Sequence, residues 1–209
     1  MLAWTDILGI KGLLLKIAGI VLAGGLSTRM GADKAQLKLA DQSLLAHSVA
    51  LLDTLPLAKT FVSGHYEGYF SIPDVHPNLG PIGGLHACVK ALYNEYDALF
   101  IIPVDMPLLD SKQCKILLNA FKKLPQGVFF NGPTFPLILP LNSTLQQYLS
   151  EVLVSSEKKQ RSLYGLLEAL KIQSVNYKEQ AYFHFYNSNT PNEFQTCIEL
   201  YKKLKIAND

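Results

Sequence analysis

The chain has 209 residues, and 49% of them are hydrophobic, which is enough to fill a sizeable core and argues against disorder over most of its length. The 19 Lys and Arg residues nearly balance the 17 Asp and Glu residues, and the formal charge of +2 excludes the large basic field that drives sequence-independent binding of nucleic acids. We therefore expect one domain over residues 1–209, with residues 1–16 as a candidate N-terminal extension.

The cysteines and the N-terminal segment bear on the cellular compartment. Three widely spaced cysteines fit neither a disulfide framework nor a zinc site with paired ligands, so they are interpreted as buried, reduced side chains. The N-terminal segment is apolar, but it contains Asp6 and has no basic residue before Lys11, which disfavours a secretory signal peptide. Since no uncharged run reaches the length of a membrane span, we expect a cytoplasmic protein without a membrane partner.

The first predicted element is a buried strand over residues 17–22. This apolar run ends in Ala-Gly-Gly at 23–25, so the strand opens into a glycine loop. Apolar residues at helical spacing predict a helix over 44–52, and a second short strand is expected over 59–62. The order is therefore strand, helix, strand.

The same alternation continues along the chain. A helix is predicted over 83–93, a near-continuous apolar strand over 98–104, and a helix over 111–124 with Ser111 as its N-cap. Four more elements are expected further on, a strand at 128–130 and helices at 143–154, 162–170 and 191–204. Alternating units of this kind predict an α/β fold, with a mostly parallel sheet and helices on both faces.

The loop after the first strand, residues 22–34, suits an anionic ligand. Its Gly24 and Gly25 let backbone amides approach phosphate oxygens without a Cβ atom in the way, and Arg29 and Lys34 supply charge against a triphosphate. The spacings of a P-loop and of a dinucleotide fingerprint are both absent. The alternative interpretation is a tight turn with surface cations.

A second candidate is Asp105, which follows the strand expected over 98–104. Open α/β sheets bind ligands at the carboxyl edge of their strands. A carboxylate beside bound phosphates there suits Mg²⁺, which keeps most of its waters and takes few protein ligands. An aspartate near Pro107 is also typical of a turn, which is the alternative.

The segment LAGGLSTRMGADK at 22–34 resembles the signature of nucleotidyltransferases, and specifically of the molybdenum cofactor guanylyltransferase (MobA) family. The resemblance implies a Rossmann-like, three-layer nucleotidyltransferase fold. It also implies transfer of GMP from GTP to the phosphate of molybdenum-molybdopterin, with release of pyrophosphate and formation of the molybdopterin guanine dinucleotide cofactor. Molybdoenzyme maturation proteins are further partners that the family suggests.

The resemblance also assigns site residues. Arg29, Lys34 and Asp105 are implied to be catalytic, and Asp105 is implied to bind Mg²⁺. The implied nucleotide-binding residues are Leu22, Ala23, Gly24, Gly25, Lys34, Ser63, Asp74 and Asp105.

Two further segments resemble parts of the same family. The Gly-Pro-x-x-Gly sequence at 80–84 resembles its second glycine loop, and Asp74 corresponds to the aspartate that contacts guanosine, although two turns flanking a helix start are the alternative. Near the C-terminus, Asn187 and Asn189 belong to a segment that resembles the family's Asn-x-Asn-Thr-Pro, which is associated with the pterin substrate. Their amides can both donate and accept hydrogen bonds, as pterin recognition requires, and Thr190 suits the N-cap of the last helix.

Two other functions stay open from the sequence. One is a related nucleotidyltransferase that uses CTP or another phosphorylated acceptor. The other is a nucleotide-binding adaptor without catalysis, which the presence of Arg29, Lys34 and Asp105 argues against.

Overall fold

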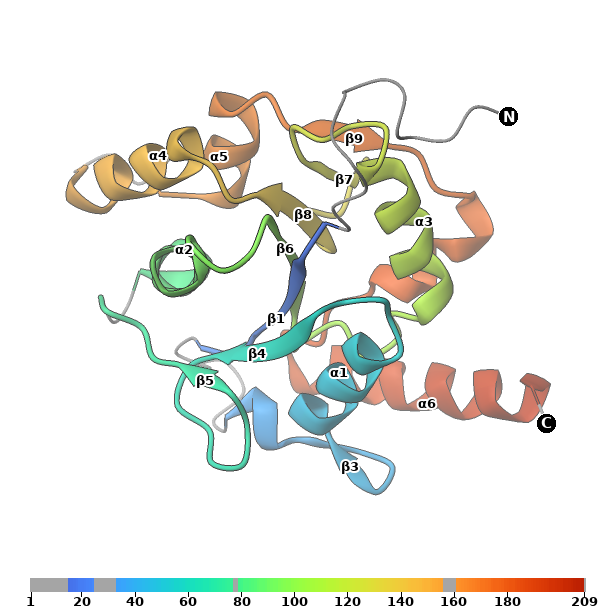
Figure 1. Cartoon of the computed structure of the whole chain (residues 1–209). Coiled ribbons are helices and arrows are strands. Elements are labelled where there is room, and N and C mark those ends of the chain that lie inside the picture. Colours follow the sequence, from blue (N-terminus) through green and yellow to red (C-terminus); the bar gives the residue numbers. More distant parts are fainter. Residues whose placement is uncertain (1–14, 25–32, 77–78, 156–160, 209) are drawn as a thin grey trace.

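The computed structural model describes residues 15–24, 33–76, 79–155 and 161–208. Within these ranges a seven-stranded sheet has the order β5-β4-β1-β6-β8-β7-β9, and β2 and β3 form a separate small hairpin (Figure 1). The strands are β1 (Ile17–Leu22), β2 (Lys38–Leu39), β3 (Gln42–Ser43), β4 (Lys59–Ser63), β5 (Ser71–Ile72), β6 (Ala98–Pro103), β7 (Val128–Phe130), β8 (Leu137–Pro140) and β9 (Gln173–Val175).

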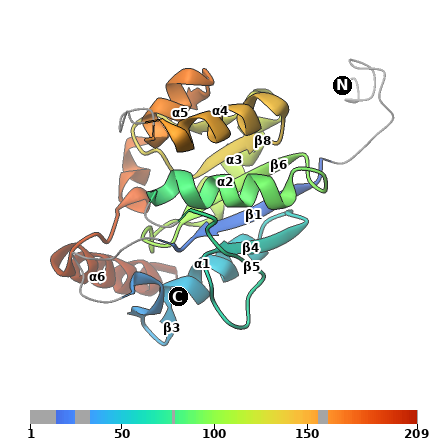
Figure 2. The ribbon, with the colours of Figure 1, turned by 90° about the vertical axis from the view of Figure 1, so that its left-hand side faces the viewer.

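Helices cover both faces of the sheet. In the part of the chain that the structure describes, the α-helices are α1 (Leu44–Asp53), α2 (Gly80–Leu92), α3 (Ser111–Phe121), α4 (Ser143–Val154), α5 (Leu163–Ala169) and α6 (Pro191–Asn208), and the 3₁₀ helices are η2 (Lys34–Gln36) and η3 (Glu179–Phe185). Figures 1 and 2 place α2, α4 and α5 on one face of the sheet and α1, α3 and α6 on the other. The three-layer α/β fold predicted from the sequence is therefore confirmed.

The sheet is mostly parallel, as expected. The central strand β1 pairs in parallel with β4 and with β6, and β7 pairs in parallel with β9. The strand β8 runs antiparallel to both of its neighbours, β6 and β7. The sequence analysis did not predict β8, and its reversal is the departure from a purely parallel arrangement in the described sheet.

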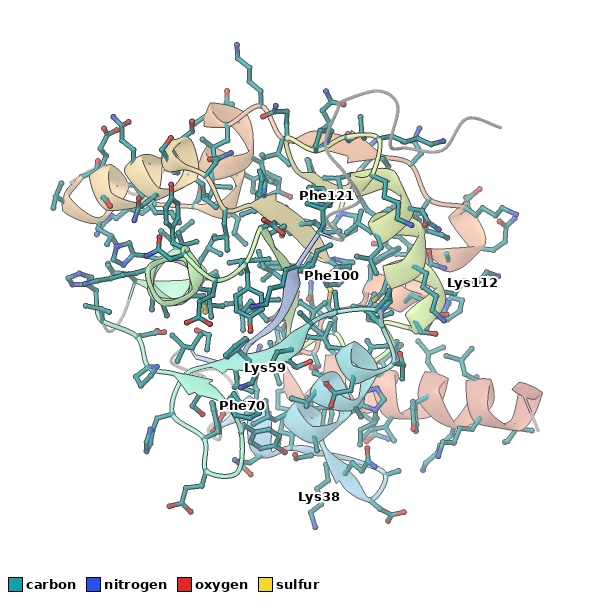
Figure 3. All side chains as sticks on the ribbon, viewed as in Figure 1. Lys38, Lys59, Phe70, Phe100, Lys112 and Phe121 are labelled. Carbon is teal, nitrogen blue, oxygen red and sulfur yellow. The ribbon has the colours of Figure 1, made fainter. Side chains whose placement is uncertain are left out.

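The core lies around β1 and β6. Burial on both faces explains why these strands read as continuous apolar runs, since a sheet covered by helices on both sides leaves no solvated face. Phe100 of β6 is fully buried, and Figure 3 shows it near the middle of the molecule. At the β5 edge of the sheet, the ammonium group of Lys59 lies 3.3 Å from the ring centroid of Phe70, a favourable cation–π contact (Figure 3).

Most predicted elements are confirmed, with shifts at their ends. The expected helix at 83–93 begins earlier, at Gly80, because Pro81 suits the first turn of a helix. The N-cap of α3 is Asp110 rather than Ser111, since the Asp110 carboxylate accepts a hydrogen bond from the backbone N–H of Gln113. The helix expected to end at Leu124 ends at Phe121.

The register of the central strands creates one functional edge. Leu22, the last residue of β1, is aligned with Ser63 of β4 on one side and with Pro103 of β6 on the other. The residues that follow these three strands therefore meet at the carboxyl edge of the sheet, where open α/β folds bind ligands. Within the described ranges, no helix is both long enough and apolar enough to cross a membrane.

Candidate active site

A pocket lies at the carboxyl edge of the sheet, between the ends of β1, β4 and β6. The β1 side and the neighbouring loops contribute both small residues and charged groups. Its lining consists of Leu22, Ala23, Gly24, Lys34, Ser63, Gly80, Pro81, Gly84, Pro103, Val104, Asp105 and Phe135. Six of the residues that the sequence singled out, Leu22, Ala23, Gly24, Lys34, Ser63 and Asp105, thus line one pocket.

Lys34 and Asp105 form the charged centre of this pocket. The Lys34 ammonium group lies 3.1 Å from Oδ2 of Asp105, and it donates a 2.8 Å hydrogen bond to Oδ1 of Asn189. Both charged side chains are only partly exposed, at 16% and 22%, so solvent screens this ion pair less than it screens a surface pair. Three segments far apart in sequence therefore converge on one ammonium group.

A short capped turn sets the position of the Lys34 backbone. It is the first residue of η2, and the carboxylate of Asp33 caps this turn by accepting a hydrogen bond from the backbone N–H of Ala35. The hydroxyl of Tyr66 lies 3.3 and 3.4 Å from the two Asp33 carboxylate oxygens. The turn that presents Lys34 is thus tied to the connection between β4 and β5.

The segment that carries the two asparagines is anchored at two points. Ser188 is fully buried, and its backbone N–H and its hydroxyl both donate to the carbonyl oxygen of Asp105, at 2.8 and 3.3 Å. Glu193 accepts hydrogen bonds from the backbone N–H groups of Asn189 and Thr190. The Thr190 hydroxyl in turn accepts from the backbone N–H of Glu193, which completes a capping box and supports Thr190 as the helix cap. Asn187 is exposed in the same segment.

Asp74 lies beside the glycines of the pocket. Its Oδ1 atom accepts a 3.2 Å hydrogen bond from the Ser63 hydroxyl. A Cβ atom on Gly24 would lie 3.3 Å from Asp74 Oδ2, and one on Gly84 would overlap the Ser63 hydroxyl. Glycine at these two positions therefore leaves room beside a carboxylate and a hydroxyl at the pocket wall.

Two histidines hold the chain just after Asp105. The Nε2 atom of His47 lies 3.1 Å from the carbonyl oxygen of Pro107, and Nδ1 of His184 lies 2.8 Å from the carbonyl oxygen of Leu108. Burial lowers the pKa of His47, an effect that the hydrogen bond to Pro107 partly opposes and the nearby charge of Lys205 strengthens. The neutral imidazole is therefore favoured, and its N–H donates to the Pro107 carbonyl.

The three cysteines are free and buried, as the sequence analysis expected. Cys88 packs next to Ser63, and burial raises the pKa of its thiol to about 12. A thiol with so high a pKa is a poor nucleophile at neutral pH, so Cys88 is a packing residue.

Two predicted site residues lie outside the described ranges, and the structure adds three residues that the sequence analysis did not predict. Gly25 and Arg29 lie outside the described residues. Sequence reasoning missed Ser188, Tyr66 and Glu193; the Thr-x-x-Glu spacing of a capping box was a usable signal for Glu193. Ser188 and Tyr66 donate hydrogen bonds to backbone carbonyl oxygens, and no sequence pattern predicts such contacts.

The residues present fit a metal bound together with phosphates. Within the described part of the chain, no group of three or more His, Cys, Asp or Glu side chains is arranged to hold a metal ion. Asp105 offers one carboxylate at the pocket, and this suits Mg²⁺, which takes most of its ligands from water and substrate phosphates. A cation held by the protein alone would need more ligands than Asp105 provides.

Comparison with known proteins bears on the family to which this chain belongs. The family model of the MobA-like NTP transferase domain matches residues 19–172. The molybdenum cofactor guanylyltransferase of Xanthomonas euvesicatoria pv. vesicatoria is 37% identical over 180 residues, which cover 86% of this chain and 93% of that protein. A protein named probable molybdenum cofactor guanylyltransferase, from Carboxydothermus hydrogenoformans, is 24% identical and covers 87% of this chain and 94% of its own.

Solved structures share the fold at low sequence identity. Molybdopterin-guanine dinucleotide biosynthesis protein A from Archaeoglobus fulgidus has a TM-score of 0.66 at 20% identity, covering 89% of this chain and 99% of that one. A CMP:2-keto-3-deoxy-manno-octonic acid synthetase in complex with CTP has a TM-score of 0.65 at 15% identity, covering 90% and 99%. With the family model matching most of its length, this chain belongs to the family of MobA-like NTP transferase domains.

Proposed function

We propose that this nucleotidyltransferase transfers GMP from GTP to the phosphate of molybdenum-molybdopterin, releasing pyrophosphate and forming the molybdopterin guanine dinucleotide cofactor. The observation that carries the proposal is the meeting of Lys34 and Asp105 in the lining of one pocket, with Asn189 hydrogen-bonded to the same Lys34 ammonium group. The relative that shares 37% identity is named for this activity, which supports GTP and the molybdenum cofactor as substrates.

The reaction needs positioning and charge neutralisation more than covalent chemistry. An oxygen of the acceptor phosphate attacks the α-phosphorus of GTP, while the bond from the α-phosphorus to the bridging oxygen breaks and pyrophosphate leaves with that oxygen. Lys34 is proposed to offset the charge that builds on the leaving group, and Arg29 is proposed to assist it. The chain holds both reactants in line, which lowers the entropic part of the barrier.

Asp105 is proposed to bind Mg²⁺. Magnesium would supply electrostatic stabilisation to the phosphate oxygens when it is bound. In the present geometry Asp105 Oδ2 faces the Lys34 ammonium group. Binding of the nucleotide gives Lys34 a phosphate to contact, and this leaves the carboxylate available to the cation.

The guanine base is proposed to lie beside Asp74. A carboxylate oxygen accepts hydrogen bonds, and guanine presents two adjacent donors, N1–H and the N2 amino group, whereas cytosine lacks this pair. Gly24 and Gly84 leave room at this wall, and Ser63 orients the carboxylate through its hydrogen bond. Backbone groups of the segment from Leu22 to Gly25 are proposed to contact the base and phosphates.

The pterin is proposed to contact the segment of Asn187 and Asn189. The exposed Asn187 amide can donate and accept hydrogen bonds with the heterocycle. Asn189 accepts a hydrogen bond from Lys34, so a pterin held by this segment would lie beside the residue proposed to contact the phosphates. The anchoring of Ser188 to Asp105 keeps this segment beside the nucleotide.

The proposal is tested by measuring pyrophosphate release with the purified full-length chain, molybdenum-molybdopterin and Mg²⁺, with GTP in one series and CTP in the other. Pyrophosphate release and guanine dinucleotide formation with GTP, at a kcat/KM well above that with CTP, is the expected result. Faster pyrophosphate release with CTP than with GTP would contradict the proposal and indicate transfer of CMP instead of GMP. Tight binding of GTP without any product would instead identify a nucleotide-binding adaptor.

A further inference from the structure

The hydroxyl of Tyr66 lies between two segments of the site, the end of β1 and the turn that begins at Lys34. Its hydroxyl lies 3.1 Å from the carbonyl oxygen of Ala23, at the end of β1, and within 3.4 Å of both carboxylate oxygens of Asp33, which caps the turn of Lys34. One phenolic O–H can donate to only one acceptor at a time, so it is shared between these two positions. Ala23 and Lys34 both line the pocket.

The surroundings of Tyr66 fix the ring in this place. The Ser71 hydroxyl donates to the carbonyl oxygen of Tyr66 at 2.7 Å and accepts from its backbone N–H at 3.0 Å. Gly64 adopts a φ of +121°, and a Cβ atom there would lie only 2.8 Å from a ring carbon of Tyr66. A glycine, a serine and a half-buried aromatic ring therefore combine to direct one hydroxyl.

The hydroxyl stays a donor under ordinary conditions. Burial raises the pKa of Tyr66 to about 12, and the neighbouring Asp33 carboxylate adds to the effect. The phenol is therefore neutral at physiological pH, and its proton is available to Ala23 or Asp33.

We infer that Tyr66 is a positioning residue for nucleotide binding, which sets the distance between the end of β1 and the turn that presents Lys34. The inference rests on the proposed nucleotide site. Lys34 reaches Asp105 from a turn of only three residues, so a shift of Asp33 moves the ammonium group directly. Tyr66 is not among the residues that line the pocket, so we expect it to affect the affinity for the triphosphate through the position of Lys34.

The test replaces Tyr66 by phenylalanine, which removes the hydroxyl and keeps the ring. Tyr69→Phe is the matched control, because Tyr69 lies in the same connection, is also half-buried and packs against the same core. Equilibrium binding gives Kd for the magnesium complex of whichever triphosphate the wild-type chain turns over. We expect Tyr66→Phe to raise this Kd about three- to tenfold, as loss of one hydrogen bond does. The KM for the pterin acceptor should not change.

A second variant and a stability measurement distinguish a change in nucleotide affinity from simple destabilisation of the fold. Ser71→Ala, which frees the backbone of Tyr66, should raise Kd in the same direction, while Tyr69→Phe leaves it unchanged. Thermal unfolding of each variant identifies simple destabilisation, which lowers Tm without changing Kd of the folded fraction. An unchanged Kd in Tyr66→Phe, or equal effects on nucleotide and acceptor, overturns the inference. If the wild-type chain binds no triphosphate, the proposed function itself fails.

Discussion

Lys34 and Asp105 lie 71 positions apart in the sequence, and their side chains meet at 3.1 Å across the carboxyl edge of the sheet. This pairing follows from the parallel neighbours β1 and β6, which deliver the two segments to the same edge. Each charge neutralises the other in this state, and each is suited to a partner on a magnesium–triphosphate complex. We expect Lys34 to exchange Asp105 for a phosphate, and Asp105 to exchange Lys34 for the magnesium ion, when the nucleotide binds.

Replacing Lys34 by alanine should lower kcat by about 10²-fold or more, because one preorganised electrostatic contact to the phosphates is lost. Steady-state assay of pyrophosphate release measures the effect. Turnover within about threefold of wild type would remove Lys34 from the mechanism, since even one oxyanion donor contributes more than that.

Asp105→Asn should abolish activity at ordinary magnesium concentrations, because an amide oxygen is a weaker ligand for a hard cation than a carboxylate. A titration of activity against magnesium distinguishes a lost ligand from a lost fold, and circular dichroism checks the latter. The same substitution also removes the carboxylate that lies 3.1 Å from the Lys34 ammonium group. A wild-type magnesium dependence in Asp105→Asn would show that the cation is bound elsewhere.

Asp74→Asn should reduce the preference for GTP over CTP. The amide offers guanine one acceptor and one donor where the carboxylate offers two acceptors, so kcat/KM for GTP should fall by about tenfold or more. Activity with CTP should change little. Comparison of kcat/KM for the two nucleotides is the measurement, and an unaltered ratio would separate Asp74 from base recognition.

Gly84→Ala should destabilise the fold and impair nucleotide binding together. The added methyl group overlaps the Ser63 hydroxyl and lies 3.3 Å from Asp74 Oδ1, so we expect a cost of about 1–3 kcal/mol, the range for overpacking. Chemical denaturation measures this loss. Adding Ser63→Ala in the same chain removes the overlapping atom and should restore much of the stability, and failure to do so would place the strain elsewhere.

The stability of the chain should decrease below about pH 6.5 through His47. Burial lowers the pKa of this imidazole in the folded chain, so the unfolded chain takes up a proton first as the pH falls through the unperturbed value near 6.5. The stabilisation is fully present above that pH and is lost progressively below it. Denaturant unfolding of wild type and His47→Gln between pH 8 and about pH 5 checks this, because glutamine keeps a donor for Pro107 but does not titrate. Parallel pH profiles for the two proteins would contradict the prediction.

Local pattern was sufficient for the elements with clear periodicity or continuous burial. The helix at 143–154 was predicted with the bounds that the structure has, and the structure adds that the Asn142 side chain caps it by accepting a hydrogen bond from the backbone N–H of Leu145. The strands β1 and β6 were evident as apolar runs, since both of their faces are covered. Their adjacency is what brings Lys34 to Asp105.

Other features depend on tertiary contacts that local pattern does not contain. The strand β8 is short, lies between Pro136 and Leu141, and acquires its direction only from pairing with β6 and β7. The sequence analysis predicted Ser111 as the cap where the structure has Asp110, because both side chains can accept a backbone hydrogen bond and residue type alone does not separate them. The role of Tyr66 depends on distances to backbone atoms, which residue types alone do not set.

The two hydrogen bonds that Ser188 donates to the Asp105 carbonyl make the two halves of the site mechanically continuous. A ligand that shifts Asn187 or Asn189 therefore also shifts the backbone of Asp105, just after β6. Thermodynamic reciprocity then requires that whatever one substrate does to the affinity for the other is returned in equal measure. In such an enzyme, binding of either substrate would change the affinity for the other before the chemical step.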